Sequence, residues 1–172
     1  LGGLLAFVAG AVNAGGFLAV QRYTSHMTGV VSGLADDLVL GHAALVAAGA
    51  ASLLSFVSGA AVTAILINWA RRRHLQGEYA LSLMLEAGLL LLFGLLGANL
   101  NLLIEVTVPT TVLLLCFIMG LQNAIVTKIS RAEIRTTHMT GVITDLGIEL
   151  GRMLYWNRVH DPDLGDPVRG NR

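Results

Sequence analysis

This sequence has few charged residues: they make up 13% of its 172 residues, whereas soluble domains carry about 25%. So few charges cannot form the polar coat that a soluble chain of this length needs. Hydrophobic residues make up 55% of the chain, and the mean hydropathy is +0.71. The composition therefore predicts an integral membrane protein whose main partner is the lipid bilayer.

Other scarcities exclude other classes of protein. The formal net charge is zero, so nothing indicates binding to nucleic acid. The one cysteine, Cys116, cannot form an internal disulfide and is interpreted as a small buried hydrophobe. The chain has no Gly-x-Ser-x-Gly or His-Glu-x-x-His motif and no paired intramembrane aspartates, so we expect neither an enzyme nor a cofactor.

Long apolar stretches dominate what is present. A membrane-spanning helix takes about 20 mostly apolar residues, and four stretches qualify, at 1–20, 42–70, 79–100 and 106–127. Two shorter and more polar stretches, 24–40 and 136–156, complete the predicted fold class, an all-α integral membrane protein with six transmembrane segments. These segments form one domain, 1–156, and the polar stretch 157–172 is interpreted as an exposed tail.

The distribution of lysine and arginine predicts the orientation, because cytoplasmic loops are enriched in both. Basic residues follow the first, third and fifth segments, at Arg22, at 71–73, and at Lys128, Arg131 and Arg135. If every segment spans, these connections share one side, which we interpret as cytoplasmic. The same alternation places the tail outside, although the tail carries Arg158, Arg169 and Arg172.

One pattern occurs twice: "TSHMTGVVSGLADDL" begins at Thr24 and "TTHMTGVITDLGIEL" begins at Thr136. A Phe-x-x-Gly-x-x-Asn-Ala motif precedes each copy, at 7–14 and 117–124. Two motifs in the same order predict an internal repeat of two segments, 7–40 and 117–152. Transport folds are often built from such repeats and bind substrate where the repeats meet. The predicted orientation favours a parallel relation between the copies, which a re-entrant segment would reverse.

These motifs carry a resemblance to a known family. With Gly10 and Asn13, "HMTG" at 26–29, "GLQNA" at 120–124 and "TTHMTGVITDLG" at 136–147, the chain resembles the YoaK family of small bacterial membrane proteins, a domain of unknown function. The resemblance covers essentially the whole chain. It implies a helical, multi-pass protein of the bacterial cytoplasmic (inner) membrane with about six spans, and it supplies no activity.

The Thr-Gly pairs, Thr28–Gly29 and Thr140–Gly141, are typical of helix starts, because threonine can cap free amides and glycine lets the backbone turn. The 12 residues from Gly29 to Leu40 would form a helix of roughly 18 Å, short of the roughly 30 Å hydrocarbon core. One interpretation is therefore a broken segment, an extended piece followed by a half-helix that begins inside the membrane. The alternative is one continuous helix over 24–40, with its polar end near the headgroups.

Polar residues around the two helix starts form the predicted substrate-binding set. Its members are Asn13, Ser25, His26, Thr28, Gly29, Gln122, Asn123, Thr137, His138, Thr140 and Gly141. Asp145, Glu149 and His138 are candidates for proton coupling, because histidine titrates near neutral pH and acids inside a membrane are functional by default. The alternatives are interhelical hydrogen bonds for the histidines and ion pairing with Arg152 for the acids. Glu86 is interpreted as reaching to the cytoplasmic interface, and no metal-ligand spacing is recognisable.

Taken together, the sequence favours a secondary transporter or carrier of a small polar or anionic solute, with a proton-linked mechanism as an option. Its site would lie where the two Thr-Gly half-helices meet. The alternative is a structural or accessory membrane protein without transport activity. A stripe of small residues, Ala51, Ser55 and Gly59, predicts close helix packing and, on that basis, a homodimer.

Overall fold

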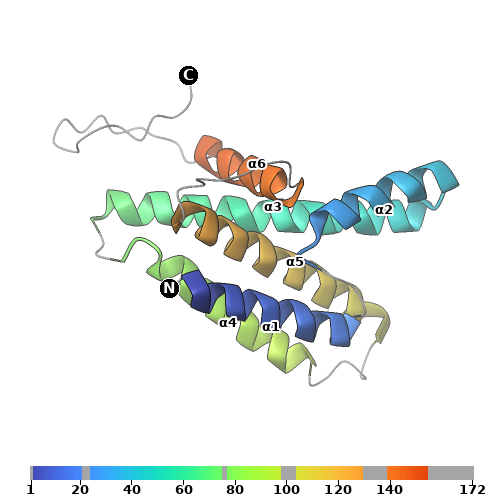
Figure 1. Cartoon of the computed structure of the whole chain (residues 1–172), viewed down its shortest axis with the longest axis horizontal. Coiled ribbons are helices and arrows are strands. Elements are labelled where there is room, and N and C mark those ends of the chain that lie inside the picture. Colours follow the sequence, from blue (N-terminus) through green and yellow to red (C-terminus); the bar gives the residue numbers. More distant parts are fainter. Residues whose placement is uncertain (1, 21–23, 75–76, 98–103, 130–138, 155–172) are drawn as a thin grey trace.

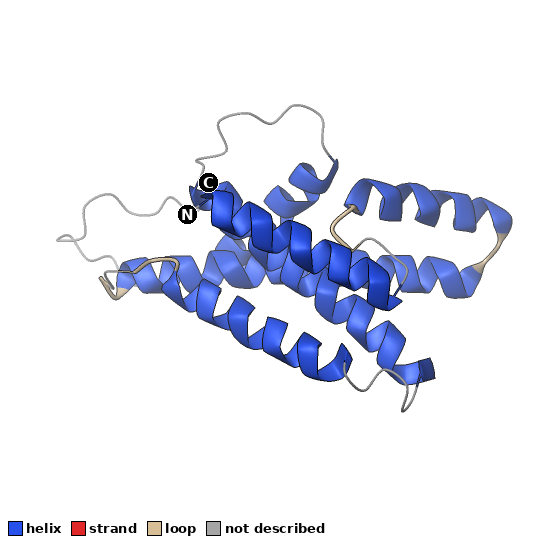
Figure 2. Ribbon diagram, turned by 60° about the horizontal axis from the view of Figure 1, so that its bottom comes forward, coloured by secondary structure: helices blue, strands red, loops and turns tan. Residues whose placement is uncertain are grey.

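The structure is a computed structural model that describes residues 2–20, 24–74, 77–97, 104–129 and 139–154. These residues form six α-helices and no strand (Figures 1 and 2). The helices are α1 (Gly2–Val20), α2 (Met27–Leu40), α3 (Ala43–Arg72), α4 (Ala80–Gly97), α5 (Ile104–Ile129) and α6 (Met139–Leu154). The predicted all-α class is thus confirmed for the described part of the chain.

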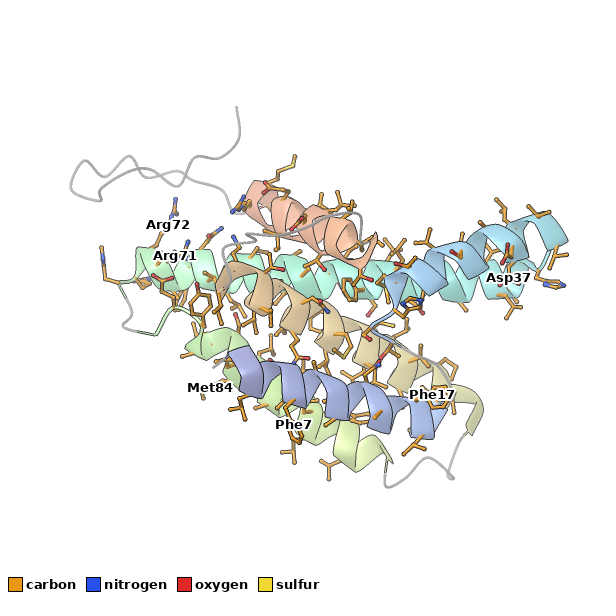
Figure 3. The ribbon with its side chains drawn as sticks, in the orientation of Figure 1. Phe7, Phe17, Asp37, Arg71, Arg72 and Met84 are labelled. Atoms are coloured by element: carbon orange, nitrogen blue, oxygen red, sulfur yellow. The ribbon has the colours of Figure 1, made fainter. Side chains whose placement is uncertain are left out.

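Two of the described helices are long and apolar enough to cross a membrane, α3 with 30 residues and the 23-residue stretch Thr107–Ile129 of α5. Shorter apolar stretches lie in α1 and α4. Large apolar side chains also face outward, among them Phe7 of α1 and Met84 of α4 (Figure 3). These features indicate a membrane protein, while the six crossings expected from the sequence stay a prediction.

The central packing unit is the crossing of α3 and α5. The Ser55 hydroxyl donates to the carbonyl oxygen of Leu113 at 2.7 Å, and the Thr63 hydroxyl donates to that of Leu121 at 3.1 Å. Both pairs are separated by 58 residues, so the two helices run in the same direction. Close approach is possible because Gly59 faces the α5 backbone. The predicted small-residue stripe therefore packs helices within one chain.

The helices α2 and α6 both pack on α3, and they run away from each other along it (Figure 1). Leu34 of α2 contacts Gly49 near the start of α3, and Met27 packs with Phe56 near its middle. From that level α6 continues along the C-terminal half of α3, where Gly151 faces Ala61. The two half-length helices therefore begin side by side near the middle of α3.

The matching helices of the predicted repeat also run in opposite directions. Gly16, late in α1, lies against Leu115 of α5, whereas Ala9 and Val12, earlier in α1, pack on the cluster that contains Met119 (Figure 1). The arrangement differs from the parallel relation that the charge distribution favours. The parallel relation is expected from a count in which every segment crosses the membrane. Because α2 and α6 begin beside the middle of α3, such a count does not give the directions of the helices in the two copies.

Candidate functional site at the helix starts

Both short helices begin at the methionine of the repeated His-Met-Thr-Gly motif, α2 at Met27 and α6 at Met139. The described residues before α2, Thr24 to His26, are not helical. The 14 residues of α2 therefore extend over about 21 Å, less than a hydrocarbon core of about 30 Å. The helix of this segment is thus shorter than the 24–40 of the continuous interpretation, while the start inside the membrane that the broken-segment interpretation expects stays a prediction.

The start of α2 has no side-chain cap. His26 occupies the position before the first turn with φ −91° and ψ 70°, and its side chain makes no capping hydrogen bond. Its carbonyl oxygen accepts from the amide of Val30 at 3.2 Å. The first amides of an α-helix have no partner within the helix, so the amides of Thr28 and Gly29, two exposed residues, make no hydrogen bond to the backbone of α2. The predicted threonine cap is wrong here, because α2 already begins one residue before Thr28.

A buried hydroxyl lies next to this uncapped start. Thr24 is 2% exposed, and within the described part of the structure its Oγ1 atom has no hydrogen-bond partner. The neighbouring Ser25 hydroxyl donates to Oδ1 of Asn13 at 2.9 Å, which ties α1 to the segment before α2. The structure therefore brings Asn13 and Ser25, two members of the predicted set, together, and it adds Thr24. The sequence signal for Thr24 was its place as the first residue of the repeated stretch.

The two helix starts meet through apolar side chains. Met27 of α2 is fully buried in a cluster with Phe56, Met119 and Ile143, the last on the first turns of α6. Thr140 and Gly141 are half-buried on the turn before Ile143, and Thr28 and Gly29 follow Met27 directly. We call the region formed by residues 24–29, residues 140–143 and Asn13 the helix-start junction.

The histidine of the first motif copy lies at the surface of the junction. His26 is exposed, and its imidazole covers Gly29, since a Cβ atom built there would lie 2.5 Å from Cδ2 of His26. Its counterpart in the repeat, His138, lies outside the described residues together with Thr137.

Other predicted site residues lie at varying distances from the junction. Asn123 donates from Nδ2 to the carbonyl oxygen of Met119 at 2.7 Å, one turn from the cluster, and Gln122 is buried beside it on α5. Asp145 is half-buried on the turn after Gly141. Glu149, by contrast, forms an ion pair with Arg152 near the end of α6. The structure thus separates Glu149 from the helix starts.

For one acid, Glu86, the structure differs from the position expected from the sequence. Glu86 is 3% exposed, and its carboxylate oxygens are buried without a hydrogen-bond partner in the described structure. The interpretation that it reaches to the interface is therefore wrong for this arrangement. Its only sequence signal was an acid inside an apolar run. The described residues contain no cluster of histidine, cysteine, aspartate or glutamate that could hold a metal ion.

The described residues thus define a small helical protein, with two helices that are long and apolar enough to cross a membrane and a junction of two helix starts. A family model described as "Protein of unknown function (DUF1275)" matches residues 1–171, and the chain belongs to this family. The family is uncharacterised, which is consistent with the resemblance to a YoaK-like family. No curated protein and no solved structure matches the chain.

Proposed function

We propose that this protein is a multi-pass carrier of the bacterial cytoplasmic membrane, and that a small polar or anionic solute binds at the helix-start junction. The observation that carries the proposal is the meeting of α2 and α6 near the middle of α3, with the start of α2 uncapped. A helix start presents free amides and about half a positive charge. Two such ends would attract an anion without any arginine.

Polar side chains of the junction supply the orientation that such a solute needs. The unpartnered hydroxyl of Thr24 can donate to an anion or accept from a polar solute. The bond between Ser25 and Asn13 holds the segment before α2 against α1, next to that hydroxyl. These groups are neutral, which suits a carrier that must release its solute as well as bind it.

The ends of the helices support an orientation for this carrier. Arg71 and Arg72 lie at the end of α3, whereas Asp37 lies at the opposite end of the molecule (Figure 3). Lys128 of α5 interacts electrostatically with Arg71 and with Arg152 of α6, so the ends of α3, α5 and α6 share one side. By the positive-inside rule this side is cytoplasmic. Ending α6 there removes the conflict with the arginines of the C-terminal tail.

A second function is favoured by one specific observation. Apolar side chains fill the space where the helix starts meet, and Met27, Met119 and Ile143 are almost fully buried. For a carrier this packing is a closed state that must open. For a structural or accessory membrane protein it is the permanent state, and the polar groups only stitch helices together. A homodimer, in either case, needs a surface other than Ser55 and Gly59, which α5 covers.

Reconstitution into proteoliposomes tests the carrier. Stopped-flow light scattering follows swelling with chloride, nitrate, formate, sulfate, phosphate, urea and glycerol, and chemical analysis afterwards shows whether any solute was altered. We expect faster uptake of at least one solute than in empty vesicles. Gly141→Leu should abolish that difference by filling the junction, and Gly29→Leu should disturb it by displacing the His26 imidazole that covers this glycine. Gly33→Leu is the matched control, because a Cβ atom there meets nothing within 4 Å. Uptake equal to empty vesicles across all solutes would favour the accessory protein.

A further inference from the structure

The acid Glu86 lies in the packed interface between α4 and α5, away from the helix-start junction. Leu83 and Leu89, three residues to either side on α4, pack on Leu121 and Ile125 of α5. A residue three positions away is on the same helix face, so Glu86 points into this apolar interface. Ser82, one turn earlier, is fully buried on the same face, and its hydroxyl also has no partner in the described structure.

Among the described residues of the surrounding helices, no basic side chain pairs with Glu86. On α5, Cys116 belongs to the cluster around Met27, and Lys128 interacts with Arg71, Arg152 and Glu149. On α3, the arginines lie at its end, where Arg71 bonds Glu78 at 2.8 Å and Arg73 lies over Trp69. Tyr79, a titratable residue that packs against Leu121 and Ile125, directly precedes α4. The helix α1 carries no titratable side chain.

A carboxylate held this way is costly. Removing an unpaired charge from water costs several kcal/mol in a protein, so such a group takes up a proton instead. We propose that Glu86 is a proton-binding site of the helix bundle: its carboxyl group holds a proton while α4 and α5 are packed together, and releases it to water when that interface opens. The use of this proton to drive solute uptake rests on the proposed function; the binding itself does not.

Selective carbodiimide labelling of the full chain in membranes tests the proton site without any transport assay. Dicyclohexylcarbodiimide is apolar and converts protonated carboxyl groups in apolar surroundings to a stable N-acylurea, which peptide mass spectrometry locates. Asp36, exposed on α2, is the internal control. We expect at least about tenfold more labelling of Glu86 than of Asp36, because the apolar reagent reaches buried groups and a buried carboxyl group without a partner holds a proton. A water-soluble carbodiimide with an amine should show the opposite preference.

Two results would overturn the proposal: equal labelling of Glu86 and Asp36 by the apolar reagent, or preferential labelling of Glu86 by the water-soluble one. Infrared spectroscopy provides a second readout, because the band of a protonated carboxyl group should disappear in Glu86→Gln and persist in Glu86→Asp. In vesicles that take up solute, Glu86→Gln should abolish uptake driven by a pH gradient and keep solute exchange. Labelling of Glu86 without any transport would support the proton site and contradict only the carrier. Transport without labelling of Glu86 would support the carrier and contradict the proton site.

Discussion

Gly120 of α5 lies so close to Phe56 of α3 that a Cβ atom on the glycine would overlap the carbonyl oxygen of Phe56. The relationship is reciprocal, because Gly59 of α3 faces the carbonyl oxygen of Phe117 in the same way. Hydroxyl-to-carbonyl bonds from Ser55 and Thr63 lie on either side of this crossing. The two longest helices of the described chain are thus held backbone to backbone, and the other helices pack around them.

The first prediction concerns this crossing. Gly120→Ala should lower the free energy of unfolding by about 3 kcal/mol, the upper end for overpacking, because the obstacle is backbone and cannot rotate away. Gly94→Ala is the control, since a Cβ atom at Gly94 meets nothing within 4 Å and alanine favours a helix. Unfolding of both variants by sodium dodecyl sulfate in mixed micelles, followed by circular dichroism, measures the difference. Equal stability of the two variants would contradict the close approach.

The second prediction concerns the bond between Ser25 and Asn13. Ser25→Ala and Asn13→Ala should each cost about 1 kcal/mol, the typical net value of a hydrogen bond. The double variant should cost clearly less than the sum, because both single changes remove the same 2.9 Å bond. The same unfolding assay, applied to the native chain, the two single variants and the double variant, completes this double-mutant cycle. Strictly additive effects would show that the two side chains do not interact in the membrane.

The third prediction concerns topology. Arg152→Cys and Arg73→Cys should both be protected from a membrane-impermeant maleimide in intact cells and labelled after lysis, because α3 and α6 end on the same side. Asp36→Cys, at the opposite end, should be labelled in intact cells. The native Cys116 is buried and should not react. Labelling of Arg152→Cys without lysis would restore the alternation in which all six segments cross.

A fourth prediction follows from the buried acid. Glu86→Leu should raise the free energy of unfolding by about 1–3 kcal/mol, because it removes buried polar atoms that have no partner in the described structure. Glu78→Leu should change it by less than about 0.5 kcal/mol, since Glu78 forms a partly exposed ion pair with Arg71. Thermal unfolding in detergent compares the two. A destabilised Glu86→Leu would mean that the carboxyl group has a stabilising partner in the membrane.

Much of the fold and part of the site could be predicted because local chemistry determines them. The helix starts at Met27 and Met139 lie within the repeated motif, and the Asn13 side chain meets Ser25 in the copy that follows it. Both results depend on short stretches of sequence: the repeated motif contains the helix start, although threonine does not cap it, and a lone amide on an apolar helix needs a partner.

The remainder depends on distant parts of the chain. The opposite directions of α1 and α5 follow from where α2 begins along α3, which charge counting cannot detect. The burial of Glu86 depends on how α4 rotates onto Leu121 and Ile125, and an acid early in an apolar run suits an interface equally well. The stripe at Ser55 and Gly59 predicts close helix packing, but small residues allow close contact with a helix of a second chain as well as with α5.

The last prediction concerns the junction itself, through Met27 and Ile143. Both side chains belong to one buried cluster, so Met27→Cys with Ile143→Cys should be joined by a short thiol cross-linker in membranes. Cys116→Ala is needed as the background, because the native thiol lies in the same cluster. Leu40→Cys with Ile143→Cys is the control pair, since Leu40 ends α2 and should not be joined.

Cross-linking also separates the two functions. A carrier must part the helix starts to admit solute, so the bridge between Met27→Cys and Ile143→Cys should stop uptake in proteoliposomes, and a reducible linker should restore it after reduction. An accessory protein would show the bridge with no uptake before or after it. If the pair is not joined while the fold is intact, α2 and α6 do not begin together, and the amides of Thr28 and Gly29 have no second helix start with which to share an anion.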